Sequence, residues 1–269
     1  MYKIRKTSLI LTVFIILILS GTPAWAVRPF ITDDATIIGS GRSEVANWFY
    51  GMDGRLEIWH SINYGITDNF EFTLAGSHGG LKSEVNGEWK YAYTLPLLQS
   101  KVQIRDYEPN GIPALAFGIG SQLPFGNEPF ENQSAFKPSG YGAFGFVSIT
   151  QCIGENEELL IHGSLGGTYL RDSGENKNGL TWGVGTQFKM YKGLHGIAEF
   201  VGGDPYTGNS TSRIYQLGIR YFISDDFQFD LAYGNGSETD YWISGGIRWV
   251  IDFSKSKKNK FAPNGRKIS

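Results

Sequence analysis

The feature that most limits how this chain can fold is the residue alternation in one stretch near its C-terminus, Tyr241 to Phe253. Its odd positions are apolar except for Gly245, and its even positions are mostly polar or small. A period of two places successive side chains on opposite faces of a β-strand. The stretch suits the ~9–11 residues that a tilted strand needs to cross a bilayer, whereas soluble strands average ~5–6. Arg248 lies mid-stretch on the polar face, which favours a wet lumen over a dry core.

The same alternation recurs along the chain between turn signals, which predicts about twelve strands. An even number is what single-chain outer-membrane barrels require. The pattern is weak in two of the stretches, and in 141–153 it is ambiguous because Phe144 and Phe146 alternate against Val147 and Ile149. The predicted strands cover residues 43–50, 55–66, 70–74, 98–107, 112–123, 141–153, 159–171, 180–190, 194–201, 215–223, 227–233 and 241–253.

The connections between these stretches alternate in length. Tight turns are expected near Thr67, Pro109, Gly154, Lys192 and Asp225. Longer polar connections are expected at Ser77–Tyr93, Pro124–Pro138, Asp172–Asn178 and Asp204–Thr211, and the short Gly51–Gly54 is the exception. Short periplasmic turns alternate with long extracellular loops in outer-membrane barrels. The sequence therefore predicts an all-β, transmembrane, antiparallel up-and-down barrel in the Gram-negative outer membrane, with both termini on the periplasmic side.

The two ends of the chain differ from the barrel in composition. Residues 1–26 read as a signal peptide, with basic residues first, then an apolar run, then Ala24-Trp25-Ala26 as a cleavage site. Residues 27–42 are a lead-in or a plug folded into the barrel mouth, and residues 43–253 are the barrel. Residues 254–269 form a basic periplasmic tail without acids, whose charges are Lys255, Lys257, Lys258, Lys260, Arg266 and Lys267. Cys152 has no partner cysteine, so an intrachain disulfide is excluded.

Three short motifs resemble patterns in known proteins. Arg28 to Ala35, RPFITDDA, together with the turn Gly65-Ile66-Thr67-Asp68, resembles the outer-membrane transporter family of the MetA-pathway of phenol degradation. That resemblance implies a barrel that passes small hydrophobic or aromatic compounds. The pattern Ser244-x-Gly246-x-x-Trp249-x-Ile251 resembles the C-terminal signal that the barrel-assembly machinery reads, so this machinery and outer-membrane lipid are the expected protein and lipid partners.

A channel or transporter is the first of three functional hypotheses. The alternation places a mixed charged and aromatic set of side chains in the lumen, and such a lining suits an amphipathic solute. In the second hypothesis the opposite charges pair across a narrow lumen and close it, leaving a structural or surface-binding barrel. The candidate lumen residues are Glu57, Trp59, Glu71, Lys101, Arg105, Lys189, Glu199, Arg220, Phe222, Asp230, Trp242 and Arg248.

The third hypothesis is a lipid hydrolase that uses His162 and Ser164. Period two puts both side chains on one face, where a base reaches a nucleophile. A lipid-cleaving pair has to face the bilayer, however, and here Ile161 and Leu165 take that side. The sequence therefore predicts no enzyme, no catalytic residue and no cofactor.

Metal and nucleic-acid binding are also not expected. The four histidines, His60, His78, His162 and His195, show no ligand spacing, and His60 interrupts an otherwise apolar face. The chain carries 26 acidic residues against 24 basic ones, three of which lie in the predicted signal peptide. Such an acidic balance speaks against a nucleic-acid partner.

Overall fold

The computed structural model describes residues 31–83, 85–127, 140–172, 175–204, 209–237 and 241–253. Over these ranges the chain forms twelve strands, which confirms the predicted number. No helix in these ranges is long and apolar enough to span a membrane. The strands are β1 (Arg42–Met52), β2 (Arg55–Thr67), β3 (Phe70–Lys82), β4 (Trp89–Arg105), β5 (Ala114–Asn127), β6 (Gly140–Ile153), β7 (Leu159–Asp172), β8 (Glu175–Tyr191), β9 (Leu194–Asp204), β10 (Asn209–Ser224), β11 (Phe227–Gly236) and β12 (Trp242–Asp252).

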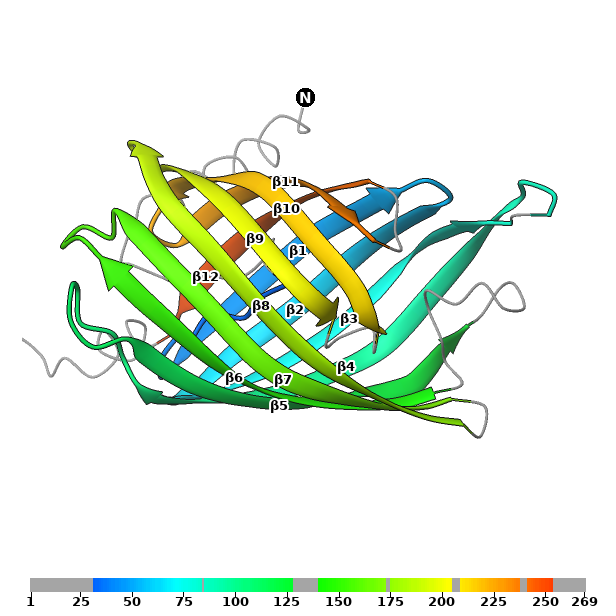
Figure 1. Ribbon diagram of the computed structural model, residues 1–269, viewed down its shortest axis with the longest axis horizontal. Coiled ribbons are helices and arrows are strands. Elements are labelled where there is room, and N and C mark those ends of the chain that lie inside the picture. Colours follow the sequence, from blue (N-terminus) through cyan, green and yellow to red (C-terminus); the bar gives the residue numbers. More distant parts are fainter. Residues whose placement is uncertain are drawn as a thin grey trace, which may run out of the picture.

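The strands close into one barrel (Figure 1). Each strand pairs antiparallel with the next along the chain, and β1 also pairs with β12, from Arg42 opposite Asp252 to Met52 opposite Trp242. Closure leaves no strand edge with unpaired backbone groups. In lipid, each unpaired backbone group would cost several kcal/mol. The fold is the up-and-down barrel that the alternation predicts.

Alternate side chains face outward and inward, as predicted. On β10, Leu217 and Ile219 are 61% and 46% exposed, whereas the flanking Gln216 and Arg220 are 2% and 0% exposed. On β12, Ile243 and Ile247 are exposed while Trp242 and Arg248 are buried. Large apolar side chains therefore cover the outside of the barrel, which is the surface that lipid requires.

The predicted long connections are shorter in the structure because the strands are longer. The segment Ser77–Tyr93 was expected as a loop, but β3 runs to Lys82 and β4 begins at Trp89. Glycines at 76, 79 and 80 and the inward Ser77 hide the alternation there. Of the predicted loop Asp172–Asn178, residues 172 and 175–178 are strand, since β7 ends at Asp172 and β8 begins at Glu175. Of the predicted loop Asp204–Thr211, residues 204 and 209–211 are strand, since β9 ends at Asp204 and β10 begins at Asn209.

The predicted loop Pro124–Pro138 and the predicted tight turn near Pro109 also differ from the structure. Of the predicted loop Pro124–Pro138, residues 124–127 belong to β5 and residues 128–139 lie outside the described residues. The turn between β4 and β5 covers residues 106–113, so the turns on its side of the barrel are not uniformly tight. The difference in length between the two sets of connections is therefore smaller than the sequence indicates.

Both ends of the described chain meet at one end of the barrel, here called the terminal end. Gly41 donates its backbone N–H to the Gly65 carbonyl over 3.0 Å, and Phe253 donates to the Gly41 carbonyl over 3.0 Å. Gly39 and Gly41 have positive φ angles of 79° and 70°, which lets the chain turn sharply as it passes into β1. The predicted signal peptide and basic tail lie outside the described residues.

Candidate functional site

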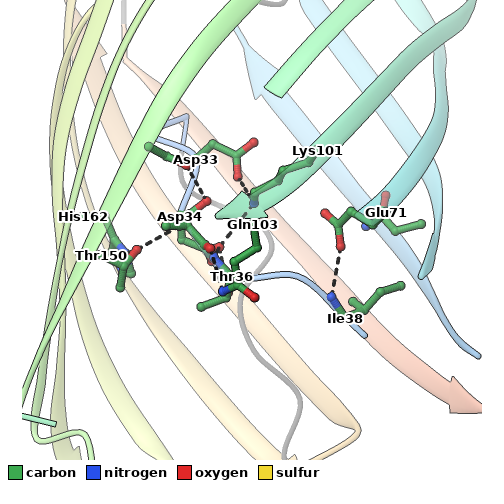
Figure 2. Close-up of polar contacts among 12 residues, drawn as sticks. Asp33, Asp34, Thr36, Ile38, Glu71, Lys101, Gln103, Thr150 and His162 are labelled. Carbon is green, nitrogen blue, oxygen red and sulfur yellow. Dashed lines mark hydrogen bonds and ion pairs between the residues drawn. The ribbon is translucent and has the colours of Figure 1, made fainter. Parts of the chain in front are cut away.

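An extended segment ahead of β1, residues 31–41, crosses the lumen (Figure 2). Ile31 donates its backbone N–H to Glu199 on β9 over 2.9 Å, and Thr32 donates to the same carboxylate. Ala35 donates to the Thr150 hydroxyl on β6 over 2.9 Å. Because β9 and β6 belong to different parts of the wall, these bonds stretch the segment across the interior.

The segment continues to a third wall anchor on β3. Ile38 donates its backbone N–H to Glu71 over 3.0 Å. Ala35 also accepts a hydrogen bond from Gln103 on β4 over 3.0 Å, through its carbonyl oxygen. Glu71 and Glu199, both predicted for the lumen, therefore hold backbone N–H groups of the chain itself.

A lysine on β4 pairs with the acids of this segment. Lys101 Nζ lies 2.7 Å from Asp33 Oδ1 and 3.5 Å from Asp34 Oδ1. Asp34 also accepts hydrogen bonds from the backbone N–H and the hydroxyl of Thr36, over 2.9 and 2.8 Å. Its carbonyl accepts the Ser148 hydroxyl over 3.0 Å. The Thr-Asp-Asp-Ala motif thus packs into the lumen wall, in which Lys101 is buried.

Two buried arginines pair with acids along the wall. Arg220 Nε lies 2.8 Å from Asp230 Oδ1, and Arg248 Nε lies 2.5 Å from Glu44 Oε2. Gln228 donates to Asp230 over 2.9 Å and accepts from Arg248 over 3.4 Å, which joins the two pairs. We call these five residues the wall network. Both arginines are at most 1% exposed, so their charges are neutralised inside the wall.

The structure places three further predicted lumen residues near the terminal end. Arg105 is exposed and donates to the Pro113 carbonyl over 2.8 Å, and Lys189 is also exposed. Phe222 packs edge-on against His195, with ring centroids 5.0 Å apart. These three side chains lie apart from the wall network and the crossing segment.

Aromatic side chains gather towards the opposite end, on β1, β2 and β12. Trp59 stacks on Trp48 with ring centroids 5.7 Å apart, and its Nε1–H donates to Glu57 over 2.6 Å. Tyr50 packs on Trp242 with centroids 5.6 Å apart. The sequence predicted the lumen positions of Glu57, Trp59 and Trp242. It missed Trp48 and Tyr50, because the alternation in β1 is weak.

The structure resolves the ambiguous faces of β6. Phe144 and Phe146 are 7% and 4% exposed and point inward, where their rings stack with centroids 6.4 Å apart. They lie over two glycines of β5: a Cβ built on Gly118 would come within 2.3 Å of the Phe146 ring, and one on Gly120 within 2.2 Å of Phe144. Phe144 and Phe146 therefore add an apolar patch to the lumen.

A small cavity, with room for about one water molecule, lies beside the crossing segment. Ile31 and Asp33 bound it on one side, and Phe146, Thr181 and Val201 bound it from the wall. Its lining combines apolar side chains with a hydroxyl and a carboxylate. A cavity of this size accommodates water and not a larger solute.

The pair named in the hydrolase hypothesis, His162 and Ser164, does not face lipid, as the alternation predicts. His162 is 2% exposed, and its Nδ1 lies 3.0 Å from the Thr150 hydroxyl inside the barrel. Ser164 follows on the same inward face and borders the cavity.

The structure brings together two histidines that the sequence left scattered, with His60 Nε2 3.1 Å from His78 Nε2. Neither belongs to a group of three or more metal-ligating side chains among the described residues.

The barrel is similar to solved outer-membrane channels. The COG4313 outer membrane channel from Pseudomonas putida F1 superimposes with a TM-score of 0.61 and 10% identity, over 84% of this chain and all of that chain. The KdgM porin in complex with disordered oligogalacturonate gives a TM-score of 0.55 and 9% identity, over 77% of this chain and 98% of that chain. At such identities the likeness shows a shared outer-membrane β-barrel fold.

The comparison with protein families corrects the resemblance drawn from RPFITDDA. No curated protein matches the chain. The family model that does match spans residues 14–250, and it is not that of the MetA-pathway of phenol degradation family. A motif of eight residues is outweighed by a match over most of the chain. The chain belongs to the family described as uncharacterised conserved protein UCP029691.

Proposed function

We propose that the protein is a passive outer-membrane channel for small, partly apolar or aromatic solutes. The observation that carries the proposal is a closed barrel of twelve strands whose inward face bears the stacked Trp48 and Trp59 and the buried Phe146. In a barrel of eight strands, side chains are enough to fill the interior. A barrel of twelve strands is wider. The names of the structural neighbours, an outer membrane channel and a porin, support the same class.

In this proposal the lining attracts the solute mainly through apolar contact, and less through net charge. Lys101, Arg220 and Arg248 are each paired with a carboxylate, so they present little free positive charge to a solute. The stacked Trp48 and Trp59 and the inward Phe146 offer aromatic faces instead. The other candidate lumen residues keep their predicted role in the pathway of a small, partly apolar or aromatic solute.

In this proposal the crossing segment is a plug that restricts the pathway, rather than a loose lead-in. It is held at Glu199, Thr150 and Glu71, on three separated strands. A solute has to pass beside it or displace one of these anchors. The plug thereby limits passage to small molecules.

A closed structural barrel is the second candidate. It is favoured by the buried wall network, because opposite charges that pair inside a barrel can seal it. In that case the crossing segment completes a filled interior. The two candidates differ in one measurable property, which is conductance.

The test is single-channel recording of the refolded protein in a planar bilayer, together with swelling of liposomes in small solutes. Wild type is expected to conduct, and Glu199→Leu is expected to conduct more because Ile31 and Thr32 lose their anchor. Ile219→Val, on the outer face of β10, is the control and should leave conductance unchanged. If neither wild type nor Glu199→Leu conducts, and liposomes that contain them do not swell, the closed structural barrel is the correct assignment.

We further propose that the protein is not an enzyme. His162 and Ser164 face the lumen beside the crossing segment, away from the bilayer that holds a lipid substrate. The signal peptide, the basic tail and recognition of Ser244–Ile251 by the barrel-assembly machinery stay predictions from the sequence. Export is checked by N-terminal sequencing of the mature protein, which should begin at Val27.

A further inference from the structure

A polar cluster interrupts the apolar outer wall of the barrel on β1, β2 and β3. His60 has the same strand parity as Ile58 and Ile62, which are 36% and 51% exposed, and it is itself exposed on that face. His78 lies on the outward face of β3, between Gly76 and Gly80. Ionisable residues on a membrane-facing surface cost free energy, so their presence indicates a function.

The hydrogen bonds around His60 decide which of its ring nitrogens carries the proton. His60 Nδ1 lies 2.5 Å from Asn47 Oδ1 on β1. An amide oxygen only accepts hydrogen bonds, so Nδ1 carries the proton and Nε2 keeps its lone pair. That lone pair is directed towards His78, whose Nε2 lies 3.1 Å away and whose ring is tilted by only 14°.

The pair lies at the level of an aromatic group on β4. His78 is opposite Tyr93 in the strand register, and its ring centroid lies 5.8 Å from that of Tyr91. Exposed tyrosines of membrane proteins concentrate at the height of the lipid headgroups, where water and ions are present. Gly76, opposite His60, has no side chain to cover the pair. The nitrogens are therefore placed where an aqueous ion reaches them.

We propose that His60 and His78 bind a divalent transition-metal ion such as Cu²⁺, Ni²⁺ or Zn²⁺ through their Nε2 atoms. Two nitrogens that each lie ~2.0–2.1 Å from a tetrahedral metal are about 3.3–3.4 Å apart, so the observed 3.1 Å has to widen slightly. Each ring also has to turn away from the line between the two nitrogens, so that its lone pair points at the metal. The proton on His78 Nε2 moves to its Nδ1 as the metal binds. Imidazole suits these metals, and Cu²⁺ should bind most tightly.

Asn47 has a defined part in this site. A histidine that ligates a metal usually donates its other ring N–H to an oxygen, which orients the ring, and Asn47 Oδ1 provides that oxygen. Loss of such a partner typically weakens metal affinity by about 10–100-fold. Asn47→Leu is therefore expected to weaken binding while leaving both ligands in place.

The test uses the full mature protein, refolded in detergent without an affinity tag, and titrated with CuCl₂, NiCl₂ and ZnCl₂ in a calorimeter. His60→Ala and His78→Ala should each weaken binding by at least about 10-fold, the lower limit for loss of an orienting partner alone. His195→Ala, on the inward face, is the matched control and should bind as wild type does. Heat-modifiable migration in gels confirms that each variant is folded.

A second measurement uses wild type alone, so it does not depend on variants that fold. Electron paramagnetic resonance of the Cu²⁺-loaded protein should show hyperfine coupling to two imidazole nitrogens. Coupling to one nitrogen or none overturns the proposal. Equal affinity of wild type and His60→Ala/His78→Ala in the calorimeter overturns it as well. The pair is then a hydrogen-bonded imidazole pair that satisfies its own polar groups in the wall.

Discussion

Breaking the pair of Arg248 and Glu44 should reveal whether the wall network is structural. The two side chains are 1% and 0% exposed, and their charged atoms lie 2.5 Å apart. Arg248→Met leaves the Glu44 carboxylate buried beside the Asn63 amide, which donates to it over 2.7 Å. Removing one member of a buried ion pair costs about 3–5 kcal/mol, because the other charge stays buried without its counter-charge.

The double variant separates this cost from the net contribution of the pair. Glu44→Gln should cost a similar amount, since Arg248 then lacks its carboxylate. Glu44→Gln/Arg248→Met removes both charges and keeps an oxygen that accepts from Asn63. Replacing a whole buried pair is often nearly neutral, so the double variant should lose no more than either single variant. The resulting coupling energy is about 3 kcal/mol, the upper end for residues in contact.

The assay is urea unfolding of the refolded barrel in detergent micelles, followed by tryptophan fluorescence. Simple addition of the two single losses in the double variant would refute the coupling and the geometry behind it. Single-channel recording gives a second check, because a neutralised arginine in the wall should not set ion selectivity. A marked shift towards cations in Arg248→Met would place this residue on the solute pathway instead.

Three further predictions address the outer wall, the turns and the absence of catalysis. Leu217→Arg on the 61% exposed outer face should lose about 2–4 kcal/mol in urea titration if it lies near the bilayer midplane, whereas Leu217→Val should lose far less. Burial raises the pKa of Glu157, in the turn between β6 and β7, to about 7 even though Tyr107 donates to it over 2.5 Å. The folded state then binds more protons than the unfolded state between pH 4.5 and 7, so wild-type stability should fall as pH rises through this window. Glu157→Gln should not show this slope, and an identical urea midpoint against pH in both proteins would contradict the assignment. Finally, neither wild type nor Ser164→Ala should hydrolyse phospholipid in mixed micelles; activity in wild type that is lost in Ser164→Ala would restore the hydrolase.

The faces of the strands were predictable because they depend only on local periodicity. Leu217 and Gln216 lie on the sides that a period of two assigns to them, and so do Ile247 and Arg248. The ends of the strands were less predictable. Around β3 and β4 the inward positions are small or polar, and the outward ones include glycine, histidine and tyrosine, so hydrophobicity no longer marks the faces.

The partners of the site residues could not be predicted, because they depend on closure of the whole barrel. Glu199 and Thr32 are separated by 167 residues, and Arg248 and Glu44 by 204. Similarly, ending β3 before Ser77 removed His78 from any strand register. The contact of His78 with His60 was therefore hidden by one misplaced boundary.

In the proposed channel, the anchors of the crossing segment indicate how the pathway opens. Backbone without regular structure is tolerated at membrane depth only where its polar groups find partners, and here the wall supplies Glu199, Thr150 and Glu71. A hydrogen bond to a charged group contributes about 1.5–3 kcal/mol net, because water replaces it when it breaks. Release of one such bond is therefore frequent at room temperature, whereas simultaneous release of all anchors is rare. Opening is thus expected to proceed by local detachment at one anchor while the others keep the segment inside the barrel.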